Sequence, residues 1–153
     1  MLAALPAWTD ALLTFVIAVC ALRLVWVDIR RLEIEFETLG VMAALALVQS
    51  CLSAGVVETC IRIFAGLAFY LTLVFASQRF GRLARYGAGD PPLIGVLGFL
   101  VAPMVLPWAL LSGLFMFLTC GWYAHRRGKR PFRSMYPAAP PLILAALCIY
   151  LPA

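Results

Sequence analysis

The chain alternates between long apolar segments and short stretches that hold most of its charged residues. A helix that crosses the hydrocarbon of a bilayer needs roughly 20 mostly apolar residues, and about 17 are tolerated. Six segments meet or approach this length, and they predict six transmembrane helices over about Ala11–Val27, Phe36–Leu52, Glu58–Ser77, Pro91–Ala102, Trp108–Tyr123 and Tyr136–Leu151. We therefore expect an all-α, polytopic membrane bundle.

The fourth and fifth segments come from one apolar stretch, which runs from Pro91 to Tyr123 without a charged residue. That stretch is too long for one span. Pro103 and Pro107 lie within it, and a proline inside a helix removes a backbone hydrogen bond. We expect these prolines to break the helix and so to separate two short spans.

Composition supports this interpretation. Of the 153 residues, 65% are hydrophobic and only 12% are charged, whereas soluble domains are about half apolar and a quarter charged. The six spans use nearly the whole chain. We therefore expect a single membrane-embedded domain over residues 1–153, with no separate soluble module.

The basic residues predict the orientation of the spans. Ten of the 12 Lys and Arg residues follow the first, third or fifth span: Arg30, Arg31, Arg79, Arg82, Arg85, Arg126, Arg127, Lys129, Arg130 and Arg133. Because basic loops face the cytoplasm, this pattern places both termini outside. The net charge of +5 then reflects topology and anionic lipid headgroups rather than nucleic acid.

Two aspartates are the candidate functional residues. Asp28 follows the first apolar segment, and Asp90 precedes the fourth in a Gly-x-Gly-Asp sequence. Acidic residues near lipid are costly and are functional candidates by default. The predicted topology places both near the cytoplasmic interface, where they can meet if the first and fourth helices pack together.

A pair of neighbouring carboxylates is what aspartic proteases use. The ionised partner takes a proton from water, while the protonated partner polarises the scissile carbonyl. The closeness of two like charges creates this division of labour, and the pair titrates as a unit.

Structural roles are the alternatives for the charged residues. Asp90 before Pro91 has the pattern of a helix N-cap followed by proline at the first helical position. Asp28 could form a surface ion pair with Arg31. Arg23 lies inside the first span, either extended toward the cytoplasm or in contact with an acidic group of a substrate.

Other hydrolytic chemistries lack their residues. His125 is the only histidine, which excludes an H-E-x-x-H zinc site, and Ser112 is not in a G-x-S-x-G motif. The five cysteines form no C-x-x-C pair, so we interpret them as small buried hydrophobic residues. A disulfide between Cys51 and Cys60 is an open alternative.

Three segments resemble the type IV prepilin peptidases. Asp28-Ile29-Arg30-Arg31-Leu32-Glu33-Ile34 is similar to their first aspartate motif, roughly D-[LI]-R-x-x-x-I-P-N. Gly87-Ala88-Gly89-Asp90, followed by Leu93, Gly95 and Gly98, resembles their second motif, G-x-G-D-x-K-L. Tyr136-Pro137-Ala138-Ala139-Pro140 is similar to the Y-G-P-A segment that opens their last helix.

The resemblance implies a function and a set of site residues. Asp28 and Asp90 would be the catalytic pair of a Gly-x-Gly-Asp aspartic endopeptidase in the bacterial inner membrane, with its active site toward the cytoplasm. Gly87, Gly89, Arg31 and Glu33 would bind or position the substrate. The expected substrates are prepilins or pseudopilins with a basic leader and an apolar N-terminal helix, and no metal or organic cofactor is expected.

The size of the chain resembles the short members of that family associated with Flp, or tight-adherence, pili. Longer members carry a cytoplasmic cysteine and zinc region and also methylate the new N-terminus, and this chain has no such region. The resemblance therefore implies leader cleavage without N-methyltransferase activity.

The chain also departs from the family pattern. Glu35 and Phe36 replace the usual Pro-Asn, Pro92 replaces a lysine and Ala138 replaces a glycine. Glu33, Glu35 and Glu37 form an acidic cluster, and we hypothesise that it attracts the basic leader of a prepilin. A solvated turn is the alternative for this cluster.

Two other functions stay open. A non-catalytic membrane partner in pilus assembly would explain the lost lysine and Pro-Asn. A small proton-coupled transporter would use the acids as a relay, although acids at helix ends suit that role less well than acids in mid-span.

Overall fold

The computed structural model describes residues 7–80, 90–102, 104–127 and 138–150. Within these residues the chain forms helices and no strand, as predicted. The six helices are α1 (Ala7–Arg31), α2 (Phe36–Ser53), α3 (Gly55–Phe80), α4 (Asp90–Val101), α5 (Val105–Arg127) and α6 (Ala139–Tyr150). Each corresponds to one expected segment, and the part of the sixth segment before Ala138 lies outside the described residues.

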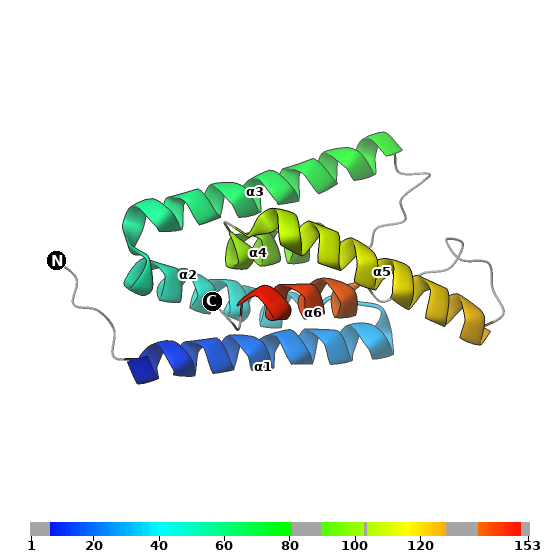
Figure 1. Cartoon of the computed structure of the whole chain (residues 1–153), viewed down its shortest axis with the longest axis horizontal. Coiled ribbons are helices and arrows are strands. Elements are labelled where there is room, and N and C mark those ends of the chain that lie inside the picture. The colour runs from blue at the N-terminus through cyan, green and yellow to red at the C-terminus, as the bar shows by residue number, and fades with distance from the viewer. Residues whose placement is uncertain (1–6, 81–89, 103, 128–137, 151–153) are drawn as a thin grey trace.

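Successive helices run in opposite directions along the bundle (Figure 1). The C-terminal ends of α1 and α5 therefore lie at the same end as the N-terminal ends of α4 and α6. Acidic residues begin several helices, such as Asp10 in α1 and Asp90 in α4, and basic residues end α1. An acidic residue near the N-terminus and a basic residue near the C-terminus each interact favourably with the helix dipole.

Two short helices form the centre of the bundle. Helix α4 contacts α2, α3, α5 and α6, while α6 contacts α1, α4 and α5. Leu93 and Leu97 of α4 and Ile143 and Ala145 of α6 are buried almost completely. These helices are apolar on every side, as expected for helices enclosed by others.

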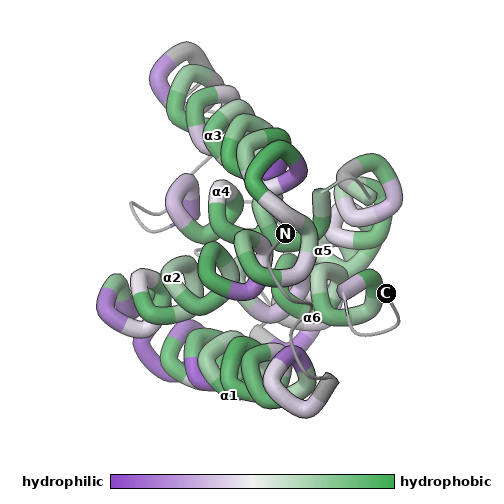
Figure 2. Tube along the Cα trace, turned by 90° about the vertical axis from the view of Figure 1, so that its left-hand side faces the viewer, coloured by the Kyte–Doolittle hydropathy of each residue, from purple (hydrophilic) through white to green (hydrophobic). Residues whose placement is uncertain are grey.

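Most residues along the helices are hydrophobic, including those of the outer helices (Figure 2). Large hydrophobic side chains such as Phe15, Val57, Phe64 and Phe117 are mostly exposed. Three helices are long and apolar enough to cross a membrane, over Trp8–Arg31, Phe36–Ser53 and Gly55–Phe75. This surface and these lengths indicate a membrane protein, because a soluble protein rarely exposes so continuous an apolar surface.

The described part of α4 and of α6 is shorter than a full span. Each has 12 residues, or about 18 Å at 1.5 Å per residue, against a hydrocarbon thickness of about 30 Å. The apolar part of α5, Leu106–Trp122, is also shorter than the three long spans.

The break between α4 and α5 differs from the prediction at Pro107. Helix α4 ends at Val101 and α5 begins at Val105, so Pro107 lies in the first turn of α5. The first turn of a helix has N–H groups without intrahelical partners, so proline is tolerated there. The prediction that Pro107 breaks the helix is therefore wrong, and Pro103 lies outside the described residues.

Glycines allow α3 and α4 to pack closely. A Cβ atom at Gly66 of α3 would lie 2.6 Å from the backbone oxygen of Gly95 of α4. A Cβ atom at Gly98 would lie 3.1 Å from the Phe69 ring. Small residues at the contact of two membrane helices permit this approach of the backbones. Gly95 and Gly98, part of the second motif, therefore have a packing role.

Replacing Gly66 by Ala is expected to destabilise the protein by about 1–3 kcal/mol, the usual cost of overpacking. The new methyl group would force α4 away from α3, because backbone atoms cannot move aside as a side chain can. Thermal unfolding in detergent measures the effect. Gly113→Ala in α5 is the matched control, since nothing lies within 4 Å of its Cβ position. Equal stability of the two variants would refute the close packing.

The five cysteines are free, so the alternative of a Cys51–Cys60 disulfide is wrong. Cys120 is buried, whereas Cys60 and Cys148 are exposed. The interpretation of all five as buried residues is therefore correct only in part. On a surface that faces lipid, an exposed cysteine is still in an apolar environment.

Candidate active site

The end of the bundle where α1 finishes brings together three chain segments. Asp28 lies in the last turn of α1, and its side chain is buried, with 5% of the residue exposed. Its Oδ2 atom accepts a hydrogen bond of 2.8 Å from the backbone N–H of Ala139, the first residue of α6. The carboxylate of Asp28 thus lies at the N-terminal end of α6, where the helix dipole favours a negative charge.

This burial rules out one alternative. A surface ion pair between Asp28 and Arg31 is wrong, because the Asp28 side chain is buried while Arg31 is exposed. An acidic group in an apolar core is costly, and the hydrogen bond from Ala139 offsets part of that cost.

Asp90 is the first residue of α4 and is followed by the buried Pro91. It lies near enough to Asp28 for the two carboxyl groups to interact electrostatically. A role of Asp90 in starting α4 is fully compatible with this position, because a carboxylate at a helix N-terminus stabilises the helix.

The helices that carry the two aspartates are joined by a third one. In the part of the chain that the structure describes, the backbones of α1 and α4 are not close neighbours, whereas α6 packs against both helices. Side chains of α1 and α4, such as Ile17 and Leu97, lie in the same hydrophobic core. The first and fourth helices therefore meet through side chains of the core and through α6, rather than through a close approach of their backbones. Helix α6 brings the two carboxyl groups together, and Ala139 takes part through its backbone, a role that sequence reasoning missed.

The position of α6 is fixed by polar contacts along its length. The indole N–H of Trp108 in α5 donates to the backbone oxygen of Leu142 at 3.2 Å. The Tyr150 hydroxyl donates to Gln49 Oε1 of α2. With the bond from Ala139 to Asp28, these contacts attach α6 to three different helices.

The turn after α1 holds a charged pair. Leu32 has a positive φ of 56° and turns the chain so that Glu35 returns toward α1. Glu35 accepts two hydrogen bonds of 2.8 Å from the Arg23 guanidinium and one from the Thr38 hydroxyl. Arg23 therefore contacts an acid of its own chain rather than only extending toward the cytoplasm.

The ion pair with Arg23 engages one member of the acidic cluster, Glu35. The hydrogen bonds from Arg23 and then Thr38 hold the pKa of the Glu35 carboxyl below its usual range. Glu35 is one of the departures from the family pattern, and here it links the end of α1 to the start of α2. The cluster available to a partner is reduced to Glu33 and Glu37, which are both exposed.

Arg31, Gly87 and Gly89 are the other residues predicted to bind or position the substrate. Arg31 is exposed, and its neighbour Arg30 lies over the Trp26 ring at 4.1 Å from the ring centre. Gly87 and Gly89 lie outside the described residues, so their role stays a prediction. Among the residues that the structure describes, no three His, Cys, Asp or Glu side chains gather as metal ligands would.

An apolar groove lies along α4. It has a volume of about 470 Å³ and is lined by α2, α3 and α4. Pro92, two residues after Asp90, lines it together with Gly95 and Phe99 of the same helix. Pro92 stands where the prepilin peptidase pattern has lysine, so this departure makes the groove apolar up to the neighbourhood of Asp90.

Comparison with protein-family models, with curated proteins and with solved structures finds no match to this chain.

Proposed function

We propose that this chain is a membrane aspartic endopeptidase that removes short basic leaders from prepilin-like proteins of the Flp type. The observation that carries the proposal is the approach of Asp28 and Asp90, which are far apart in sequence and come from oppositely directed helices. Two carboxyl groups within electrostatic reach, one of them buried and oriented by a backbone N–H, form the group that water activation requires.

The proposed reaction uses both carboxyl groups and no other catalyst. The ionised carboxylate accepts a proton from water as the water oxygen attacks the scissile carbonyl carbon. The protonated partner donates to the carbonyl oxygen. Collapse of the tetrahedral intermediate then breaks the C–N bond, and a proton passes to the leaving amine, which becomes the new N-terminus.

We propose six membrane spans with both termini outside. The C-terminal ends of α1 and α5 lie at the same end of the bundle as the start of α4 (Figure 1). Arg30, Arg31 and Arg126 belong to these two helix ends, so they lie at the end that holds Asp28 and Asp90. Two of these arginines lie over tryptophan rings, Arg30 over Trp26 and Arg126 over Trp122. Basic residues are typical of the cytoplasmic side, and tryptophans are typical of either membrane interface. Both features support the proposal that the active site faces the cytoplasm of a bacterial inner membrane.

The apolar helix of the substrate would lie in the groove between α2 and α3. Replacing Leu67, which lines the groove, by Trp is expected to fill it and to raise the KM for a prepilin several-fold with little change in kcat. Leu71→Trp is the matched control, because Leu71 is one turn further along α3, exposed, and outside the groove lining. Equal KM values for the two variants would show that the groove does not bind the substrate helix.

The basic leader would lie near Glu33 and Glu37 in and after the turn that follows α1. Replacing both by Gln is expected to slow cleavage at low ionic strength, because attraction between exposed charges is screened by salt. Cleavage rates at low and high salt give the test. A rate that is unchanged at low salt would show that these acids belong only to a solvated turn.

Co-expression with a candidate Flp prepilin tests the proposal. Leader removal appears as a mobility shift of the prepilin, and the shift should disappear with Asp28→Asn or Asp90→Asn. No shift with any prepilin would favour a non-catalytic partner in pilus assembly. Cleavage that survives both substitutions would show that the two aspartates are not the catalytic groups.

A further inference from the structure

A polar cavity lies at the end of the bundle opposite Asp28 and Asp90. It has a volume of about 360 Å³ and is lined by residues of α1, α2, α3, α4 and α6. Asp10, one of its lining residues, and Asp28 lie on the same helix about 27 Å apart along the axis. That separation is close to the hydrocarbon thickness of about 30 Å, so the cavity lies at the outer membrane interface in the proposed topology.

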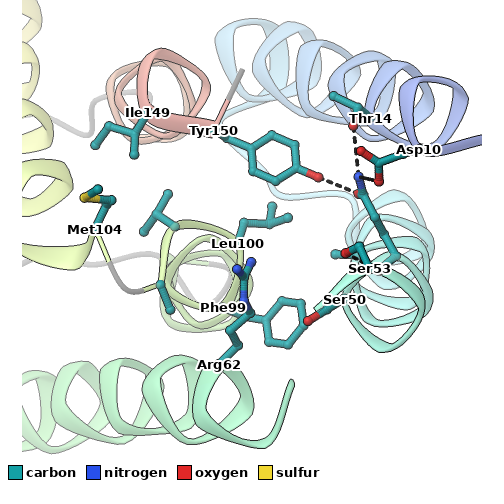
Figure 3. A pocket seen from close by; sticks show the side chains of 14 residues that line it. Asp10, Thr14, Ser50, Ser53, Arg62, Phe99, Leu100, Met104, Ile149 and Tyr150 are labelled. Atoms are coloured by element: carbon teal, nitrogen blue, oxygen red, sulfur yellow. Dashed lines mark hydrogen bonds between the residues drawn. The ribbon is translucent and has the colours of Figure 1, made fainter. Parts of the chain in front are cut away.

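One wall of the cavity is a polar network centred on Gln49. Its partners Asp10, Thr14 and Tyr150 are labelled in Figure 3. The Gln49 amide nitrogen donates to Asp10 Oδ1 at 2.8 Å and to Thr14 Oγ1 at 2.9 Å. The Gln49 amide oxygen accepts from the Tyr150 hydroxyl. Because Gln49 is buried, these bonds hold the Asp10 carboxylate in a fixed orientation at the cavity.

The cavity also carries a positive charge on a different helix. Arg62 of α3 lines it, and the Nε atom of Arg62 donates to Glu58 Oε1 at 3.2 Å. A guanidinium has five N–H donors, so this contact engages only a part of its donor capacity. Arg62 is not one of the ten basic residues that follow the first, third and fifth predicted spans, and a cation near lipid is costly without a function.

The other wall is apolar. Leu100, Met104 and Ile149 line the cavity, and Figure 3 shows Met104 and Ile149 on the side away from Asp10 and Thr14. Met104 is 55% exposed, so the apolar wall reaches the outer surface of the bundle. A ligand that fits must therefore be polar and charged at one end and apolar at the other.

We propose that this cavity binds the headgroup of a zwitterionic phospholipid that carries a primary ammonium group. Arg62 would bind the phosphate, because a guanidinium matches phosphate oxygens in geometry and charge. Asp10 would accept hydrogen bonds from the ammonium group. The glycerol and the start of the acyl chains would lie against Met104 and Ile149.

The charges select this class of lipid. Asp10, Glu58 and Arg62 together carry a formal charge of −1, which disfavours an anionic headgroup such as phosphatidylglycerol. The quaternary ammonium of phosphatidylcholine has no N–H to donate to Asp10. A primary ammonium, as in phosphatidylethanolamine, satisfies both the charge and the hydrogen-bond requirement.

Native mass spectrometry of the full chain in detergent micelles tests the proposal. Phosphatidylethanolamine, phosphatidylglycerol and phosphatidylcholine are added separately, together with soluble glycerophosphoethanolamine in a fourth sample. Phosphatidylethanolamine should bind at least about tenfold better than the other two lipids, the effect expected for a lost hydrogen bond to a charged group. The soluble headgroup should bind more weakly than the lipid, since it lacks contact with the apolar wall.

Arg62→Gln and Asp10→Asn should each reduce the binding of phosphatidylethanolamine by about tenfold. Asn at position 10 retains the oxygen that accepts a hydrogen bond from Gln49, so the fold should persist. If circular dichroism shows that Asp10→Asn is nevertheless unfolded, the result for Arg62→Gln decides the outcome. Arg126→Gln, exposed at the opposite end of the bundle, should bind like the native chain. Equal binding of phosphatidylglycerol, full binding by Arg62→Gln, or a soluble headgroup that binds as well as the lipid would overturn the proposal.

Discussion

Asp28→Asn is expected to lower the rate of leader cleavage by about 10²–10⁴-fold, the contribution that a positioned acid or base makes to catalysis. The substitution removes the charge and keeps an oxygen that can accept the hydrogen bond from Ala139 N, so the fold should persist. Asp90→Asn should give a similar loss, because Asn remains a good residue for starting a helix. Purified chain and prepilin, with cleavage followed by mass spectrometry, give the measurement.

The double variant distinguishes a catalytic pair from two separate sites. If the carboxyl groups act as one unit, losing both should cost little more than losing one. Ser112→Ala is the control, since the Ser112 hydroxyl donates to the backbone oxygen of Ala109 within its own helix. Cleavage by Asp28→Asn at the native rate, or loss of cleavage in Ser112→Ala, would contradict the aspartate mechanism.

Ala139→Pro is expected to slow cleavage by about ten- to a hundredfold while α6 remains intact. Ala139 is the first residue of α6, where proline is compatible with a helix. The substitution deletes the N–H group that donates to Asp28, and a hydrogen bond to a charged group is worth about 1.5–3 kcal/mol. Asp28 would then lose the hydrogen bond that fixes the orientation of its carboxyl group.

Ala139→Gly is the matched control, because it keeps the N–H group and removes only the β-carbon. It should cleave at close to the native rate. Equal rates for the Pro and Gly variants would show that the contact between Ala139 and Asp28 has no part in catalysis. A loss of helix content in Ala139→Pro, measured by circular dichroism, would instead assign its effect to folding.

The helical fold could be predicted because the apolar pattern is strong and the segments are bounded by charges. All six helices follow from that pattern, and the buried faces of α4 and α6 follow from their uniformly apolar sequences. The start of α5 was harder to predict. Proline has opposite effects inside a helix and in its first turn, and the sequence around Pro107 does not specify which position it takes.

The candidate site could be predicted only as two residues at one end of the bundle. The bond from Ala139 to Asp28 joins residues far apart in the chain through a backbone N–H, which carries no side-chain signal. Similarly, the pairing of Arg23 with Glu35 depends on the positive φ of Leu32, a conformation that favours glycine and that a leucine does not predict. The similarity of residues 136–140 to the segment opening the last helix of prepilin peptidases was the one available indication that α6 belongs to the site.

The mass of a Flp-type prepilin after incubation with the purified chain in lipid nanodiscs tests the central claim most directly. The native chain should produce a mature pilin that lacks its leader and carries an unmethylated N-terminus. The variant with both Asp28→Asn and Asp90→Asn should leave the prepilin intact. Leader removal by that double variant at the native rate would contradict the account.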